Sequence, residues 1–168
     1  LLESRRGGTA TIENVNATIS GAQVAGPWRV RGSGDYLGRK LDVALNTGIW
    51  KASEPFKFGL RLSPSDGSGL AYSLDGANTG EDFEGTLRIE PTAAEGGKTD
   101  AEGAWRPLVF NSRVKADFER IALDKIEIAP RGSDGANLLA GSANITLGED
   151  IKLTSELSAT RFDLDSIA

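Results

Sequence analysis

Residues 56–63 read FKFGLRLS, so that large apolar side chains occupy every second position. The same alternation runs through residues 41–46, which read LDVALN, and through residues 83–90, which read FEGTLRIE. A period of two places successive side chains on opposite sides of a β-strand, and it therefore predicts strands with one apolar and one polar face. Similar runs occupy most of the chain and are separated by turn signals, which favours one antiparallel sheet system.

The predicted fold class is all-β, an antiparallel meander of about 10–12 strands that forms a curved sheet or trough. A closed β-sandwich or a β-solenoid is the alternative, because these folds also need one apolar face on each strand. A short repeat of the form apolar-polar-apolar-any-Pro occurs at residues 60–64, 87–91 and 126–130. Proline has no N–H to donate to a ladder, so we expect it to end each of these strands.

Two stretches depart from simple alternation. Between residues 9 and 21 the apolar side chains change parity once, after Ile12. A bulge or bend at Glu13 and Asn14 would bring them back to one face. Residues 114–125 fit a helical period as well as an alternating one, and we favour a strand there.

The composition limits the possible functions. The 168 residues carry a net charge of −5 without a basic patch, which argues against a nucleic-acid partner. Histidine and cysteine are both absent, which excludes a disulfide framework, thiol catalysis and a Ser-His-Asp triad. We expect residues 1–168 to be a single β-rich segment of a larger protein, with a flexible loop at residues 92–103, where the chain is small, polar and glycine-rich.

Acidic side chains occur in three groups that could in principle carry chemistry, because paired carboxylates hydrolyse glycosides or bind calcium. The spacing of a calcium-binding loop is missing from all three, so we interpret them as solvated residues of turns and polar faces. We therefore expect no enzyme activity, no catalytic residue, no metal site and no cofactor. The three groups are Glu81 with Asp82 and Glu84, Glu149 with Asp150, and Asp163 with Asp165.

The apolar stripe is the feature that points to a function. A sheet that curves over its own apolar face would leave a trough for acyl chains, whereas the same stripe inside a closed sandwich would be an ordinary core. Trp28, Trp50 and Trp105 either pack at the core or a sheet edge, or line such a groove. The candidate lipid-contact residues are Leu41, Val43, Leu45, Phe56, Phe58, Leu60, Leu62, Leu87, Ile89, Ile145, Leu147, Ile151 and Leu153.

Several strand-and-turn elements carry a resemblance to a known family. In the C-terminal part they are residues 121–128, which read IALDKIEI, residues 139–148, which read LAGSANITLG, and residues 157–165, which read LSATRFDLD. In the N-terminal part, GPW at residues 26–28 is followed by a short hairpin through residues 41–45. With these elements the chain resembles AsmA-family proteins from about residue 12 to residue 167.

The resemblance implies a protein of the Gram-negative envelope. AsmA-like proteins carry an inner-membrane anchor and a large periplasmic β-rich region, and they are linked to outer-membrane biogenesis and homeostasis. They are related in architecture to bridge-like proteins of lipid transport. The resemblance therefore implies a periplasmic module whose parent protein is anchored in the inner membrane. The expected partners are phospholipid or another lipid, the remaining parts of the parent chain and other envelope proteins. A structural or interaction β-repeat without bound lipid is the alternative.

Overall fold

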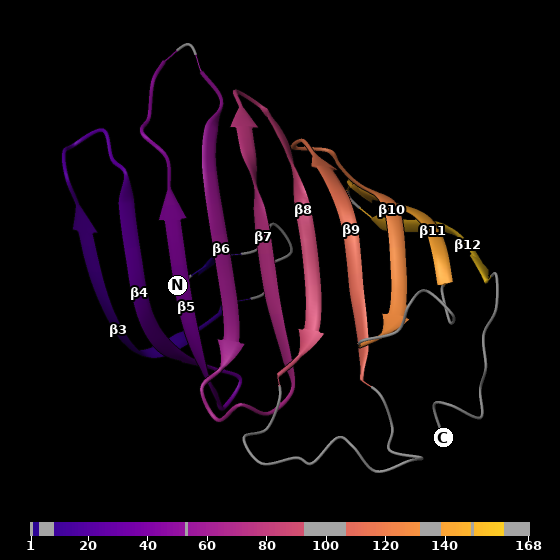
Figure 1. Cartoon of the computed structure of the whole chain (residues 1–168), viewed down its shortest axis with the longest axis horizontal. Helices are drawn as coiled ribbons and strands as arrows, with labels where there is room; N and C mark the ends of the chain where they lie inside the picture. The colour runs from indigo at the N-terminus through magenta and orange to yellow at the C-terminus, as the bar shows by residue number, and fades with distance from the viewer. Residues whose placement is uncertain are drawn as a thin grey trace.

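The structure is a computed structural model that describes residues 2–3, 9–52, 54–92, 107–131, 139–148 and 150–159. Within these residues it is all-β, without helices, as the alternation predicts. Ten strands form one antiparallel sheet in unbroken chain order (Figure 1). They are β3 (Ile12–Gly21), β4 (Trp28–Tyr36), β5 (Arg39–Thr47), β6 (Phe56–Pro64), β7 (Leu70–Thr79), β8 (Asp82–Pro91), β9 (Leu108–Ala116), β10 (Arg120–Pro130), β11 (Leu139–Leu147) and β12 (Ile151–Ala159).

Two short strands lie outside this sheet. β1 (Leu2–Glu3) and β2 (Thr9–Ala10) pair with each other in a separate two-stranded sheet. The predicted loop at residues 92–103 falls, apart from Thr92, outside the described residues, and so do Trp105, Glu149, Asp163 and Asp165.

The strand register gives the sheet one apolar and one polar face. Directly paired residues of an antiparallel sheet project from the same side, so a row of pairs can be followed across the strands. One such row consists of Leu45, Leu60, Leu74 and Leu87 on β5 to β8. The neighbouring row, displaced by one residue, consists of Ala44, Arg61, Ser73 and Arg88 and belongs to the opposite face.

A bulge occurs in β3, where the parity change predicts one. The pairs Glu13–Asp35 and Asn16–Ser33 leave Asn14 and Val15 opposite Gly34 alone. Asn14 adopts a φ of 49°, and its side-chain amide donates to the Asp35 carboxylate at 2.6 Å. The extra residue restores Val15 and the later apolar residues of β3 to the apolar face.

A second bulge explains the ambiguous stretch at residues 114–125, which forms strands rather than a helix. In β10, Lys125 and Ile126 lie opposite the single residue Ser112, and Lys125 has a φ of 51°. Ile126 is therefore returned to the apolar face, where it is buried.

The three proline repeats end strands, as predicted. β6, β8 and β10 finish at Pro64, Pro91 and Pro130. These strands run in the same direction, so all three prolines lie at the same end of the strands, at the bottom of the sheet in Figure 1. We call this rim of strand ends the proline edge. The hairpin between β4 and β5 turns at this edge through Leu37 and Gly38, both at positive φ, as in a type I′ turn.

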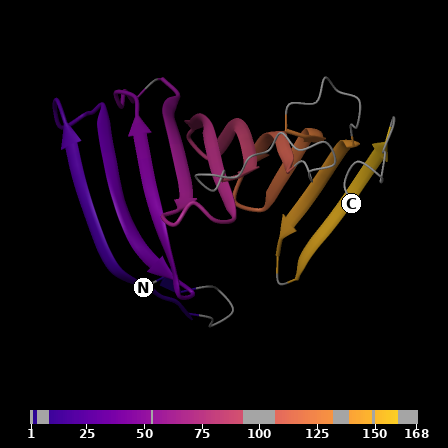
Figure 2. The same ribbon diagram turned by 60° about the horizontal axis from the view of Figure 1, so that its bottom comes forward.

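The sheet is curved and open. Figure 2 shows its β3–β5 end and its β11–β12 end sloping in opposite directions, as expected for a twisted sheet of many strands. β3 and β12 are the first and last strands of the sheet and do not pair with each other. The described residues therefore form neither a closed sandwich nor a solenoid, and the curved meander is the observed fold.

Candidate functional site

Every candidate lipid-contact residue identified from the sequence lies on the apolar face. The register places those of β5, β6 and β8 in continuous cross-strand rows, and those of β11 and β12 at the other end of the same face. We call this face the trough. The same parity adds residues that the candidate set did not include, although the sequence alternation contained the signal for them. They are Val30, Tyr72, Leu74, Phe83, Phe110, Val114, Leu123, Ile126, Ile128 and Leu157.

Burial along the trough is uneven. The middle row, represented by Leu45 and Leu74, is only half-buried, although it lies at the centre of a wide sheet. The apolar side chains of the two edge strands, such as Ile19 and Leu153, are exposed. Within the described residues, no second layer covers the face. A closed core would bury its central leucines completely.

The larger of two hollows along the trough, which we call the β4 hollow, lies over β3, β4 and β5. It has a volume of about 440 Å³, and its walls include Ile12, Val15, Tyr36, Leu41 and Val43. Gly32 and Gly34 on β4 are part of its lining, and their lack of side chains lets β3 lie close to β4, because a Cβ at Gly32 would clash with the carbonyl of Asn16. None of the residues that line this hollow is charged.

Farther along the trough, an aromatic ring covers two glycines. Gly76 and Gly85 are directly paired on β7 and β8, and the ring of Phe83 lies over both of them. This ring also stacks on Phe58, with centroids 5.3 Å apart. Aromatic cover of paired glycines fills the space that their missing side chains leave. The trough is therefore hollow at β4 and filled at β7–β8.

A second hollow, of about 260 Å³, lies at the opposite edge of the sheet from the prolines. It is lined by side chains of the strand ends, Trp28, Thr47 and Phe56, and by Val24, Ala25 and Trp50 from the two adjoining connections. The two tryptophans that the structure describes thus belong to a groove wall, which was one of the two interpretations of their sequence positions.

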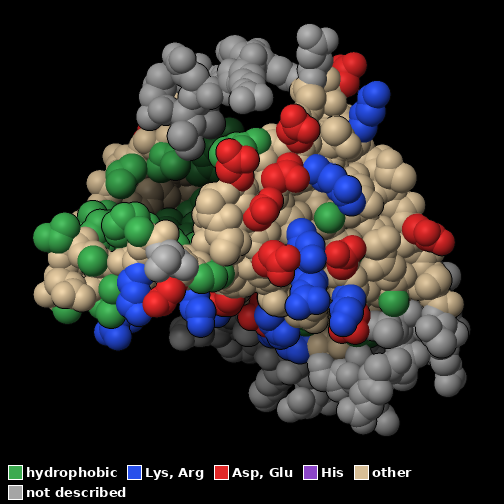
Figure 3. All heavy atoms as spheres, turned by 90° about the horizontal axis from the view of Figure 1, so that it is seen from above, with side chains coloured by type: hydrophobic (Ala, Val, Ile, Leu, Met, Phe, Trp, Pro, Cys, Tyr) green, Lys and Arg blue, Asp and Glu red, His purple; other side chains and the backbone are tan. Residues whose placement is uncertain are grey.

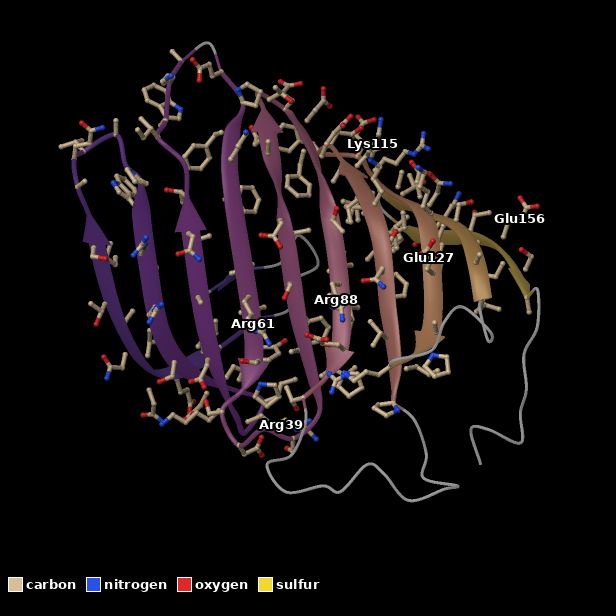
Figure 4. All side chains as sticks on the ribbon, in the orientation of Figure 1. Arg39, Arg61, Arg88, Lys115, Glu127 and Glu156 are labelled. Atoms are coloured by element: carbon tan, nitrogen blue, oxygen red, sulfur yellow. The ribbon has the colours of Figure 1, made fainter. Side chains whose placement is uncertain are left out.

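Most charged side chains of the strands lie on the polar face, whereas Arg39 at the start of β5 pairs with Tyr36 and has the parity of Leu41. Figure 4 labels charged side chains of the polar face on five strands, and in Figure 3 the acidic and basic side chains spread across one side of the molecule. Several of them pair across strands, as Lys115 does with Glu84 at 3.0 Å. The labelled polar-face residues are Arg61, Arg88, Lys115, Glu127 and Glu156.

One charged cluster holds the proline edge together. Glu90 accepts from Arg88 at 2.9 Å and from Arg131 at 3.4 Å, and the hydrogen bond from Arg88 is the main cause of its lowered pKa. Arg131 also donates to the carbonyl of Pro91 at 2.6 Å. Asp66, in the β6–β7 turn, has a lowered pKa because the Ser68 backbone N–H and then its hydroxyl donate to it.

Of the acidic residues noted in the sequence, Asp82 and Glu84 line one hollow of about 390 Å³ together with Lys115, Asp117 and Arg120. Glu84 is paired with Lys115 on the polar face, and Glu81 belongs to the β7–β8 turn. The described residues contain no group of three or more acidic side chains placed to hold a metal ion. They also contain no helix of the length and apolarity needed to cross a bilayer.

No family model, curated protein or solved structure matches this chain.

Proposed function

We propose that this chain is a lipid-binding module whose trough holds or conducts phospholipid acyl chains while the head groups remain in water. The observation that carries the proposal is the apolar face of the ten-stranded sheet, which is continuous from β3 to β12. Within the described residues it is exposed on the two edge strands, half-buried in its middle row, and buried on β9 to β11, as at Val114 and Ile126. Contiguous exposed apolar surface of this extent is typical of interaction sites, since soluble monomers rarely expose so much of it.

The β4 hollow over β3, β4 and β5 fits the chemistry of an acyl chain. Its volume of about 440 Å³ lies within the range of small-molecule sites, about 300–1,000 Å³. Each methylene that leaves water contributes about 0.8 kcal/mol, so a long chain needs no specific polar contact to be retained. A charged head group would find no partner among the residues lining the hollow, which favours its placement outside.

The resemblance to AsmA-family proteins supplies the setting of the proposal. We place the module in the periplasm, as part of a parent protein anchored in the bacterial inner membrane, with a role in outer-membrane assembly or homeostasis. Phospholipid is then the cargo, and the rest of the parent chain and other envelope proteins are the partners. The proposal includes no catalytic step.

A structural role without lipid is the second candidate, and the two outermost strands of the sheet favour it. β3 and β12 each pair with a single strand in the described structure, so each leaves a row of backbone groups able to pair with another chain. On this alternative the module would extend a larger sheet, and the apolar face would be covered by protein.

A pair of adjacent substitutions separates these functions. Leu60 lies in the middle row of the trough, and Arg61 projects from the polar face. We expect Leu60→Gln to lower the phospholipid that co-purifies with the protein without detergent by about tenfold, the factor for 1.4 kcal/mol, since a polar side chain would enter the acyl path. Arg61→Gln should leave the lipid content unchanged.

The measurement is mass spectrometry of the extracted lipid, normalised to protein, with circular dichroism as the control for folding. Equal lipid in the two folded variants, or none in the wild type, would contradict the proposal and favour the structural role.

A further inference from the structure

Two neighbouring connections at the edge opposite the prolines expose apolar side chains. The β3–β4 connection comprises residues 22–27, and the described part of the β5–β6 connection comprises residues 48–52 and 54–55. We call them the loop pair. Val24 is 93% exposed and Trp50 is 60% exposed, and Ile49 is exposed as well. Figure 3 looks down on this edge and shows hydrophobic side chains gathered at one end of the molecule, around a hollow.

Hydrogen bonds fix the loop pair as one unit. The Trp50 backbone N–H donates to the carbonyl of Ala25 at 2.7 Å, which joins the two connections directly. The Trp28 indole donates to the carbonyl of Gln23, and the Trp28 backbone N–H donates to the Thr47 hydroxyl, both at 3.0 Å. The exposed apolar side chains are therefore presented on a preorganised scaffold.

The loop pair carries little charge. Its sequence contains one cation, Lys51, and one anion, Glu54, and these two side chains form an ion pair at 2.9 Å. The rest of it is apolar or uncharged. Electrostatic attraction to a partner of either sign is therefore weak, and burial of apolar surface is the main force available.

We propose that the loop pair inserts into the interface of a lipid bilayer. Tryptophan and aliphatic side chains together are typical of that interface, where the amphipathic indole ring sits at the level of the head groups. A protein partner would need a complementary surface that buries roughly 1,200 Å² or more in total. Two short connections with Val24 almost fully exposed suit a deformable medium better than such a surface.

The loop pair adjoins the trough, so its docking would bring a bilayer next to the proposed lipid path. Val24 and Trp50 on the loop pair line the hollow of about 260 Å³ together with Trp28 and Phe56, which belong to the trough. A bilayer in contact with the loop pair would thus lie at the mouth of the trough. This last step, the entry of an acyl chain from the bilayer, rests on the proposed function, whereas the docking itself does not.

The absence of cysteine from the chain allows a direct test. Val24→Cys and, as a matched control, Leu37→Cys are each labelled with an environment-sensitive dye. Leu37 is 84% exposed at the tip of the β4–β5 hairpin, on the opposite edge of the sheet. On addition of phosphatidylcholine vesicles, we expect the dye at position 24 to brighten and shift to the blue while the dye at position 37 stays unchanged.

A second variant tests the energetics. Val24→Ser combined with Ile49→Ser should lower co-flotation of the otherwise unmodified protein with the same vesicles by about tenfold, because two apolar side chains are lost. Added phosphatidylglycerol or raised salt should change the wild-type result little.

Equal responses at positions 24 and 37, unchanged flotation of the double variant, or binding only to anionic vesicles at low salt would overturn the inference. Flotation through Val24 and Ile49 by a protein that co-purifies without lipid would support the docking while contradicting the proposed function. Co-purified lipid in a protein that does not float would do the reverse.

Discussion

Glu90 stabilises the polar face by linking residues that are distant in the sequence. Its carboxylate accepts from Arg88 on the same strand and from Arg131 beyond the end of β10. Glu90 pairs with Ala71 on β7, and both Ala71 and Val109 of β9 are buried on this otherwise polar face. The long charged side chains thus cover small apolar ones, since their stems are themselves apolar.

The lowered pKa of Glu90 predicts a pH-dependent contribution to stability. A carboxyl group whose pKa is lower in the folded than in the unfolded state stabilises the fold above its usual value of 4.5, and this stabilisation disappears as the pH falls through the folded value. At neutral pH we expect Glu90→Gln to lower the free energy of unfolding by up to about 1 kcal/mol, because the ion pairs are partly exposed to solvent.

Urea denaturation of wild type and Glu90→Gln at neutral pH and at roughly pH 3 measures this difference. The difference between the two proteins should shrink at the lower pH, because the stabilisation by the Glu90 carboxylate is lost as the pH falls toward its lowered folded-state pKa. A difference of the same size at both pH values would mean that Glu90 acts through packing alone.

Ser112 illustrates what the sequence pattern does not reveal about a single residue. It lies on the apolar face, yet it is one of the most buried side chains of the described chain. Its hydroxyl is 3.0 Å from the carbonyl of Asp124 and 3.1 Å from that of Arg113, so it donates its hydrogen at the bulge of β10. A bulge interrupts the ladder, and this hydroxyl supplies a partner there. Alternation identifies the face of Ser112, but not its partner on another strand.

Among the elements, β10 depends most on a single inserted residue. Lys125 occupies a backbone conformation that is unfavourable for side chains other than glycine, asparagine and aspartate. It nevertheless sets the register, because every residue after it is displaced by one position relative to β9 and β11. Ile126 and Ile128 reach the apolar face only because of this residue.

Deletion of Lys125 should therefore be much more harmful than its substitution. A shift of one residue would send the buried Ile126 and the half-buried Ile128 to the polar face. The loss of Ile126 alone would cost roughly 1.5–3 kcal/mol, a large part of the stability of many domains. Lys125→Gly keeps the bulge and removes the side-chain strain, so we expect it to change stability by less than about 1 kcal/mol. Thermal denaturation followed by circular dichroism compares them. Similar melting temperatures for both variants would show that the bulge does not set the register.

The two bulges differ in how visible they are in the sequence. The parity change after Ile12, with polar Glu13 and Asn14 at the switch, predicts the bulge of β3 directly. Around Lys125 the apolar residues also satisfy a helical period, so the pattern alone leaves strand and helix as competitors. Pairing with β9 and β11 resolves this competition, and such pairing is tertiary information.

For the molecule as a whole, the sequence predicts the all-β meander and the membership of its apolar face, because alternation reports both. It does not predict whether that face is open, since a sandwich and a trough need the same pattern. Nor does it predict the hollow over Gly32 and Gly34. Gly76 and Gly85 lie under the ring of Phe83, whereas Gly32 and Gly34 lie against residues of β3, and these neighbours follow from the cross-strand register.

Two adjacent residues of β7 provide a direct test of whether the trough holds acyl chains. Leu74 belongs to the middle row of the apolar face, and Ser73 belongs to the polar face between Arg61 and Arg88. A photo-reactive benzoyl-phenylalanine is placed at position 74 or 73, the protein is irradiated in cells, and adducts are identified by mass spectrometry. We predict phospholipid adducts from position 74 and few from position 73. Equal yields at the two positions, or only protein adducts from position 74, would contradict the claim.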